Sequence, residues 1–439
     1  MEEVDFLVSG AFILTLTDKG IIENGAIAIK DNITFDIGKK GILEKKYLPK
    51  RRLEYPKGLI MPGLINAHTH IAMTLFRGLA DDLPLMEWLN EHIFPAERKL
   101  TAEMVYWGSL LGCAEMILSG TTTFCDMYLF SDQVAQAAKR AGMRAVVGEV
   151  LYDFPSPSYG DLENGFRYTE KLINRWKDDP LINVAVEPHA LFTCSPDLLK
   201  RARDLAEKYS TPLIIHLSET ETEVKEIKRQ YGCTPVKHLH NLDILGHRLI
   251  AAHCVILTEE DISLLAKHQV KVVHNPESNL KLASGIAPIP KLLSSGITVA
   301  LGTDGPSSNN DLDMFLEMGT AAKLHKLTNL DPTIMPAETV LKMATTDGAN
   351  ALGLKDIGTL EAGKKADIIV IDLNSPHLIP IYNPYSHLVY AATGADVITT
   401  IVNGEVLMEN RRLYTLDLDE IREKIKEIII RLDIKTISQ

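Results

Sequence analysis

This sequence has few of the features that mark membrane-spanning, secreted or nucleic-acid-binding proteins. No apolar run approaches the length that spans a bilayer, and Glu2 and Glu3 stand where a signal peptide would carry basic residues. No long block of Lys or Arg occurs, and the net charge is −12. Neither a nucleic acid nor an anionic membrane surface is therefore an expected partner. We expect a cytoplasmic protein.

Cysteine is also scarce, and two common nucleotide-binding loops are missing. The five cysteines form no CxxC pair and are odd in number, which favours free thiols in a reducing compartment over a disulfide framework. No GxGxxG or GxxxxGK[ST] loop follows any candidate strand. This argues against a doubly wound, nucleotide-binding sheet.

Alternating strand and helix patterns fill the middle of the 439-residue chain. Amphipathic helical stretches such as Ala102–Leu118 and Pro196–Tyr209 separate short apolar runs that are rich in β-branched residues. Eight strands, nearly all followed by a helix, predict a (β/α)8 barrel. The candidate strands are Leu59–His68, Thr121–Asp126, Arg144–Val150, Ile182–Glu187, Pro212–Leu217, Leu249–His253, Lys271–His274 and Ile297–Gly302.

Both ends of the chain have a different pattern, which is typical of β-strands. Residues 1–58 are predicted to form short strands separated by turns, and further strands are predicted after residue 355. Leu418–Leu432 then reads as a terminal helix with Asp417 as its N-cap. We therefore predict an α/β protein in which a barrel of residues 59–355 is inserted in a small β-sandwich domain. Residues 1–58 and 356–439 would form that sandwich together.

Histidines and acids gather at the predicted strand ends, where the reactive groups of such barrels lie. The first strand ends in His68-Thr69-His70, and side chains two residues apart project from the same face of a strand. Taken alone, this pair also fits two ordinary histidines. Six of the fourteen histidines fall at strand ends, which a random scatter would not produce. The strand-end residues are His68, His70, Glu187, His189, His216, Glu219, His253, His274 and Asp304.

Their chemistry favours a catalytic metal. His68, His70 and His216 offer three imidazole nitrogens, and Asp304 offers a carboxylate oxygen. A metal bound there would turn water into a hydroxide that attacks an electrophilic carbon, with Asp304 as the base. Glu219 would act as an acid, although alone it also fits a solvated loop residue. His253 would stabilise developing charge, although it equally fits a buried structural histidine.

Five ordered motifs resemble the amidohydrolase superfamily and, within it, the 5-methylthioadenosine/S-adenosylhomocysteine deaminase family. The resemblance covers essentially the whole chain, including an EGKxAD-like turn at Glu361–Asp367. The motifs are PGLINAHTH at 62–70, HLSET at 216–220, AAHC at 251–254, HNPESNLKL at 274–282 and LGTDG at 301–305.

The resemblance implies a zinc aminohydrolase that converts adenine nucleosides to inosine-type products and ammonia. One Zn²⁺ per subunit would be held by His68, His70, His216 and Asp304, a ligand set that also tolerates iron, nickel or manganese. Glu219 would protonate the purine, and both Glu219 and Asp304 would contact it. His253 would assist the attacking water. Glu97 would bind the ribose hydroxyls and His189 would contact the substrate; by itself, Glu97 looks like any acid at a helix start. A small nucleoside is the expected partner, and we expect a homo-oligomer.

One position departs from the family pattern. Some members carry an arginine suited to the homocysteine carboxylate where this chain has Glu149. Like charges repel, so we expect a preference for a small or uncharged 5′ group. Alternatively, Glu149 contacts the substrate ammonium while another base holds the carboxylate.

Two other interpretations stay open at this point. A guanine deaminase or a triazine aminohydrolase or chlorohydrolase of the same superfamily would share most of the motifs, but would have no use for a ribose-binding Glu97. A barrel that has lost its metal and serves only in binding is disfavoured, because every expected ligand is present.

Overall fold

The computed structural model describes residues 1–433, and its centre consists of parallel strands in consecutive order. All eight predicted strands occur in it, the fourth of them split in two. One sheet contains β5 (Leu64–Thr69), β6 (Thr121–Tyr128), β7 (Arg144–Leu151) and β8 (Ile182–Val184). The other contains β10 (Leu213–Leu217), β11 (Leu249–His253), β12 (Lys271–His274) and β13 (Val299–Leu301).

Backbone contacts join these two sheets at both edges. The short strand β9 (Glu187–Pro188) pairs with β7, and parallel bridges connect Val186 to Leu213 and Ala190 to His216. At the other edge, the N–H of Asp304 donates to the carbonyl of His68 at 3.0 Å. The end of β13 is thereby brought next to the end of β5, while β10 lies beside the segment around β9.

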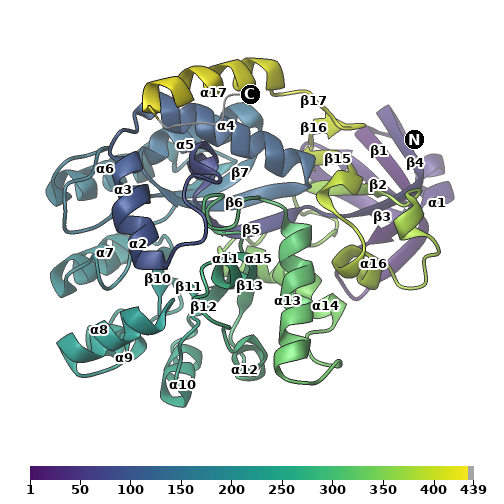
Figure 1. The fold of residues 1–439 in the computed structure, drawn as a ribbon. Helices are drawn as coiled ribbons and strands as arrows, with labels where there is room; N and C mark the ends of the chain where they lie inside the picture. Colours follow the sequence, from purple (N-terminus) through teal and green to yellow (C-terminus); the bar gives the residue numbers. More distant parts are fainter. Residues whose placement is uncertain (434–439) are drawn as a thin grey trace.

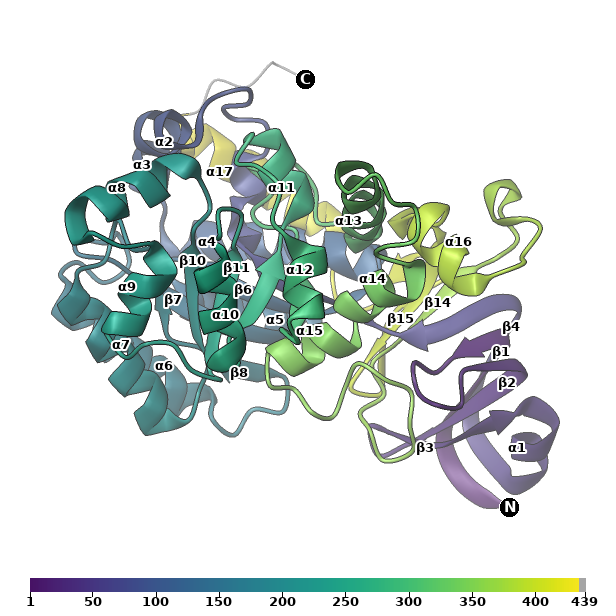
Figure 2. The same cartoon turned by 90° about the horizontal axis from the view of Figure 1, so that it is seen from below.

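Helices follow the strands and cover their outer side (Figures 1 and 2). Side-chain caps fix where they begin: the Ser195 hydroxyl accepts from Leu198 N–H before α7, and Thr258 and Asp261 form a capping box before α10. The main helices are α4 (Ala102–Leu118), α5 (Ser131–Ala141), α6 (Leu162–Trp176), α7 (Pro196–Tyr209), α8 (Glu221–Tyr231), α10 (Glu259–Lys267) and α13 (Met314–Thr328).

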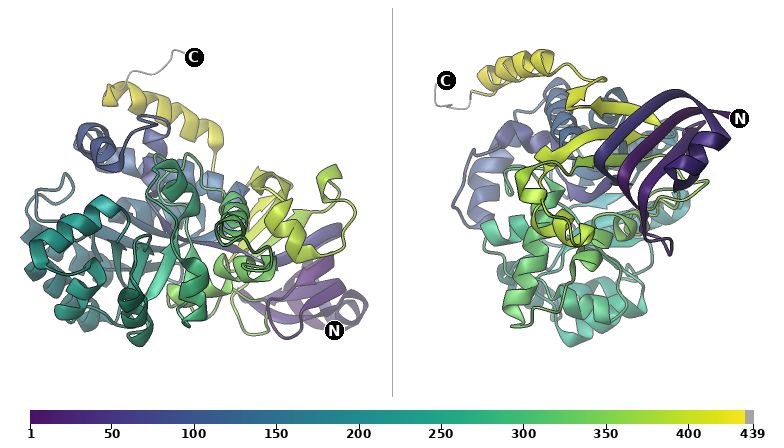
Figure 3. Two further views of the ribbon diagram at one scale, coloured as in Figure 1. Left: turned by 60° about the horizontal axis from the view of Figure 1, so that its bottom comes forward. Right: turned by 90° about the vertical axis from the view of Figure 1, so that its right-hand side faces the viewer.

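Both ends of the chain share one further sheet, drawn in purple and yellow in Figure 3. Its strand order is β17-β16-β15-β14-β4-β1-β2-β3. The strands are β1 (Glu2–Leu14), β2 (Ile21–Lys30), β3 (Ile33–Lys39), β4 (Tyr47–Pro62), β14 (Ile368–Asp372), β15 (Val397–Val402), β16 (Glu405–Glu409) and β17 (Arg412–Leu413). The expected assembly from both ends is therefore present, but as one continuous mixed sheet rather than two separately bonded sheets.

The beginning of the first central strand differs from the prediction. Residues 59–61 belong to β4, where Ile60 pairs with Val370 of β14. The chain leaves that sheet at Pro62-Gly63, and β5 starts only at Leu64. Gly63 is required there, because an added Cβ would lie 2.1 Å from the Thr122 hydroxyl.

The predicted terminal helix has the expected limits. α17 (Leu418–Leu432) begins after Asp417, whose carboxylate accepts from the N–H groups of Asp419 and Glu420. The helix lies along α4 in Figure 1. Over residues 1–433, no helix combines the length and apolar character that a membrane crossing needs.

Candidate active site

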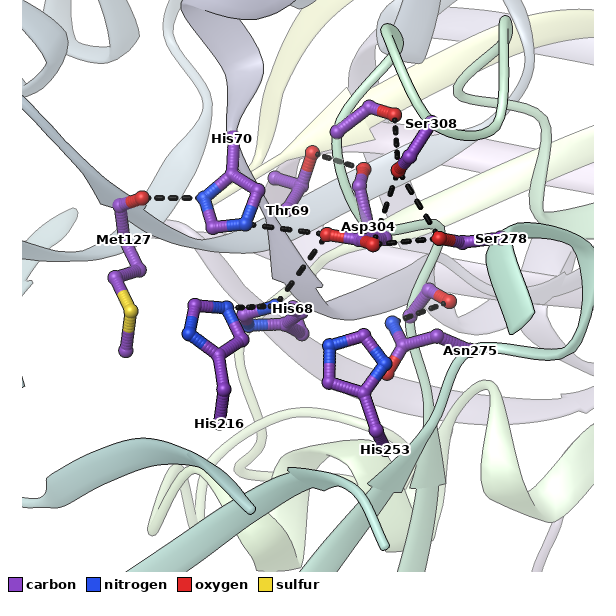
Figure 4. Close-up of polar contacts among 12 residues, drawn as sticks. His68, Thr69, His70, Met127, His216, His253, Asn275, Ser278, Asp304 and Ser308 are labelled. Carbon is purple, nitrogen blue, oxygen red and sulfur yellow. Dashed lines mark hydrogen bonds and ion pairs between the residues drawn. The ribbon is translucent and has the colours of Figure 1, made fainter. Parts of the chain in front are cut away.

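Five side chains predicted from the sequence converge at the carboxyl ends of the central strands (Figure 4). His68 lies in β5 and His70 follows it directly, His216 lies in β10 and His253 in β11, and Asp304 follows β13. His68 and His216 lie 3.2 Å apart between their Nε2 atoms. Asp304 Oδ1 lies 3.1 Å from Nε2 of His70 and 3.6 Å from Nε2 of His68.

Backbone carbonyls hold the outer nitrogens of two of these rings. Nδ1 of His216 lies 2.9 Å from the carbonyl oxygen of His189, and Nδ1 of His70 contacts the carbonyl of Met127. Because a carbonyl can only accept, each Nδ1 carries a proton, and Nε2 is the ring nitrogen left to face the centre. Metal-bound histidines are oriented by this kind of contact.

The centre has the charge balance of a cation site. Nε2 of His70 faces a carboxylate oxygen of Asp304, so this contact requires a positive charge, either a proton on His70 or a bound cation. Burial disfavours a charged His70, but Asp304 outweighs it and raises the pKa of His70 to about 9. Burial lowers the pKa of His68 to about 4. Two overlapping groups have all their donor atoms within 4.8 Å of one another, His68 with His70 and Asp304, and His68 with His216 and His253. Imidazole nitrogens and a carboxylate oxygen are donors that suit zinc, so these residues fit a divalent metal.

Two serines fix the carboxylate of Asp304. The hydroxyls of Ser278 and Ser308 donate to Oδ2 at 2.7 and 3.0 Å, which leaves Oδ1 facing the histidines. The backbone of Asp304 is left-handed, with φ of 60°, a conformation that bulky residues rarely adopt without tertiary support. Gly302 allows the close approach, since a Cβ there would lie 2.7 Å from the amide nitrogen of His68.

His253 and Glu219 lie on the side of the centre toward β11. His253 Nδ1 contacts Oδ1 of Asn279 at 3.0 Å, and its Nε2 lies 3.9 Å from Oε2 of Glu219. Burial raises the pKa of Glu219, and the charge of Asp304 adds to this while His253 opposes it. Glu219 therefore holds its proton more tightly than an exposed glutamate does and is suited to act as an acid.

A pocket opens from this centre and contains Glu97 and His189 as well. Burial raises the pKa of Glu97 to about 7, although the nearby Tyr128 hydroxyl opposes the shift. His189 Nδ1 lies 2.9 Å from the Thr193 hydroxyl, and burial lowers the pKa of His189 to about 3.

Sequence reasoning did not identify the apolar walls of this pocket or the residues that hold the polar groups in place. Ser278 and Asn279 lie inside the HNPESNLKL motif, so a signal for them was present, whereas Ser308 has none. The apolar lining comes mostly from elements between the strands, where no local pattern marks it. It includes Leu85, Trp88, Phe94, Tyr152, Phe192 and Leu282.

Glu149 requires a correction, because the structure does not bring it to the pocket. Its side chain is fully buried behind the strand ends and is absent from the pocket lining. Its carboxylate accepts from Ser131 N–H at 2.8 Å, Ser131 Oγ at 3.0 Å, and also from Phe130 N–H and Ser158 Oγ. With its oxygens bound in this way, Glu149 has no group free for a substrate.

Known proteins resemble this chain over nearly its full length. Residues 59–407 match the amidohydrolase family. The 5-methylthioadenosine/S-adenosylhomocysteine deaminase of Syntrophobacter fumaroxidans is 59% identical over 97% of both chains. The 5-methylthioadenosine/S-adenosylhomocysteine deaminase 1 of Syntrophus aciditrophicus is 52% identical over 98% of both chains. Among solved structures, a zinc-bound adenosine deaminase from Xanthomonas campestris is 39% identical, with a TM-score of 0.96 over 98% of this chain and 99% of that one.

Relatives of the two alternative classes are more distant. Escherichia coli guanine deaminase is 26% identical, with a TM-score of 0.84 over 92% of this chain and 99% of that one. A zinc-bound atrazine chlorohydrolase from Arthrobacter aurescens is 24% identical, with a TM-score of 0.89 over 97% of this chain and 100% of that one. At that identity the likeness concerns the fold alone.

Proposed function

This chain belongs to the amidohydrolase family and, within it, to the 5-methylthioadenosine/S-adenosylhomocysteine deaminases, and we propose that it deaminates adenine nucleosides by hydrolysis. The observation that carries the proposal is that the candidate metal site and Glu97 line the same pocket. A carboxylate in that place can accept the two hydroxyls of a ribose. A pocket for a free base would have no need of it.

His68, His70, His216 and Asp304 would hold a zinc ion, one per chain, and the ion would supply an acidified water beside the purine. Asp304 would take a proton from the attacking water, whose oxygen forms a bond to the amino-bearing carbon. Glu219 would donate its proton to the neighbouring ring nitrogen, which draws electrons away from that carbon. His253 would hydrogen-bond the attacking oxygen through Nε2. The carbon–nitrogen bond would then break, ammonia would leave with the proton from Asp304, the proton of the added hydroxyl would return to Glu219 as the carbonyl forms, and an inosine-type product would remain.

Glu97 and His189 would orient the nucleoside. Glu97 would accept the 2′ and 3′ hydroxyls, an interaction that is stronger when its carboxyl is ionised. His189 is neutral near pH 7 and would hydrogen-bond the substrate through Nε2, since its Nδ1 is engaged by Thr193. These contacts would place the purine over the metal centre before the chemical step.

The same proposal includes the architecture that the motifs imply. The parallel strands would form a closed (β/α)8 barrel within residues 59–355, with the shared terminal sheet contributed by residues 1–58 and 356–439. We also propose a cytoplasmic homo-oligomer in which each chain carries a complete site.

The distinguishing experiment compares substrate classes. Zinc-loaded protein would be given adenosine, 5′-deoxyadenosine, methylthioadenosine, free adenine, guanine and a chlorinated triazine, and ammonia or chloride release would be measured. We expect turnover of the nucleosides only. Turnover of guanine or of the triazine without the nucleosides would overturn the proposal in favour of the alternative class.

A further inference from the structure

A second hollow continues outward from the candidate active site. It shares Phe94, Glu97, Leu129 and Tyr152 with the inner pocket, so the two spaces adjoin at the proposed ribose contact. A 5′ substituent on a ribose held by Glu97 has this hollow within reach. Its remaining lining residues are Asn90, Arg98, Phe154, Pro155, Ser156 and Pro157.

Aromatic rings form one wall of this outer hollow. Tyr152 and Phe154 stack with ring centroids 3.9 Å apart and planes 12° apart, and Phe94 lies edge-on to Phe154 at 5.9 Å. Such faces suit a thioether and its methylene groups, because sulfur makes favourable contacts with aromatic rings. The wall therefore favours a sulfur-linked 5′ chain.

Arg98 supplies a cation at the same hollow. It follows the short helix α3 (Phe94–Glu97), directly after the proposed ribose contact, and its side chain is exposed. Within residues 1–433, no carboxylate lies within ion-pair distance of its guanidinium, and none of the side-chain hydrogen bonds involves it. A planar guanidinium without a partner is well matched to a carboxylate, which it can bind through two parallel hydrogen bonds.

The acid that was expected to repel such a carboxylate is not there. Glu149 lies behind the strand ends with its oxygens bound to Ser131, Ser158 and the N–H of Phe130, and it lines neither hollow. The charged side chains that line the outer hollow are therefore Glu97 and Arg98, while Glu149 acts on it only from behind the wall.

We infer that Arg98 binds the carboxylate of an α-amino acid linked through sulfur to the 5′ carbon, and that it thereby sets how strongly the chain binds S-adenosylhomocysteine relative to methylthioadenosine. This inference rests on the proposed function and assigns a specificity-determining residue to it. Arg98 touches only the far end of the substrate, so its effect is confined to substrates that carry the carboxylate.

The test compares three substrates with wild type, Arg98→Gln, Arg98→Lys and the control Lys99→Gln. Lys99 lies next in the chain, but its Nζ donates to the carbonyl of Leu432, away from the hollow. The substrates are S-adenosylhomocysteine, its decarboxylated analogue, which keeps the ammonium group, and methylthioadenosine. All proteins would be zinc-loaded and compared by kcat, KM and metal content.

For Arg98→Gln we expect kcat/KM for S-adenosylhomocysteine to fall roughly three- to tenfold, because KM rises while kcat stays the same. This loss lies between that expected for an exposed ion pair and that expected for a bidentate charge-assisted hydrogen bond. Arg98→Lys should fall between this variant and wild type. The other two substrates, and Lys99→Gln with all three, should stay within about twofold. Added salt should raise the KM of wild type for S-adenosylhomocysteine more than that of Arg98→Gln.

An equal loss for all three substrates, or no loss for S-adenosylhomocysteine, would overturn the role of Arg98 while leaving nucleoside deamination intact. Failure of wild type to deaminate any of the three substrates would instead overturn the proposed function itself. The two failures are therefore distinguishable in one experiment.

Discussion

His68 and His216 face each other with their Nε2 atoms 3.2 Å apart, although His216 keeps its only ring proton on the carbonyl of His189. Burial holds the pKa of both rings below the ordinary value, to about 4 for His68. Without a metal, the neutral His68 ring can hold this contact by donating a proton from its Nε2 to Nε2 of His216, which leaves Nδ1 of His68 buried without a partner. A divalent cation between the rings could instead accept the lone pairs of both Nε2 atoms.

His216→Ala should therefore lose the metal. It removes one of the three imidazole ligands, and we expect the purified variant to hold well under half of the zinc of wild type after dialysis, with activity lost in parallel. His240→Ala, on α9 (Pro235–Asn241) outside the site, is the matched control. The zinc content of each protein would be measured by mass spectrometry. Full zinc occupancy in His216→Ala would show that His216 is not a ligand.

Asp304→Asn should fold but turn over slowly. The amide can still accept hydrogen bonds from Ser278 and Ser308, but the base and a charged ligand are both lost. Because positioned acid–base groups contribute about 10²–10⁴-fold, kcat should fall by at least that lower amount. Circular dichroism would check the fold. A variant that keeps more than about a tenth of wild-type kcat would contradict the role of Asp304 as a base.

Much of this centre was predictable because its members lie at the carboxyl ends of parallel strands. The predicted strands that end at His253 and His274 match β11 and β12. The candidate metal ligands could be identified because they lie at such strand ends. Glu149 was misplaced for a physical reason. All eight residues of β7 are buried, so the strand has no alternating pattern to show which side chains face the pocket.

The outer parts of the site could not be predicted for a different reason. Arg98, Tyr152 and Phe154 lie in segments between regular strands, whose conformation depends on tertiary contacts and leaves no periodic signal. The terminal sheet shows the same limit: the strands were visible in the sequence, but their hydrogen bonding into one sheet was not.

Glu97→Gln should weaken nucleoside binding and change its pH dependence. The pKa of Glu97 is about 7, so its carboxyl loses its charge as the pH falls below that value and accepts ribose hydroxyls less strongly. We expect kcat/KM of wild type to decline below about pH 7 through KM, and Glu97→Gln to have a raised KM without that decline. Glu91→Gln, at an exposed neighbouring position, should behave as wild type. An unchanged KM would remove Glu97 from the ribose contacts.

Glu187→Gln should stabilise the protein more at pH 8 than at pH 5. Both oxygens of Glu187 are buried without a partner, and burial raises its pKa well above 4.5, with the charges of Asp126 and Glu149 adding to the shift. Above pH 4.5 the unfolded chain releases this proton while the folded chain retains it, so the group lowers stability as the pH rises. Glutamine does not titrate and removes this loss.

Thermal unfolding of wild type, Glu187→Gln and the control Glu221→Gln would be followed at pH 5 and pH 8. Glu221 is exposed on α8, and its variant should differ from wild type by the same small amount at both values. The Tm difference between Glu187→Gln and wild type should increase toward pH 8. A difference independent of pH would mean that Glu187 ionises normally in the folded protein.

The most direct measurement of the central claim is ammonia release from methylthioadenosine by the zinc-loaded protein, followed together with the loss of adenine absorbance. The account predicts one ammonia for each adenine converted, and no reaction with the Glu219→Gln variant at full metal content. If the zinc-loaded wild type releases no ammonia while guanine is consumed, or if Glu219→Gln is as active as wild type, the account of this site is contradicted.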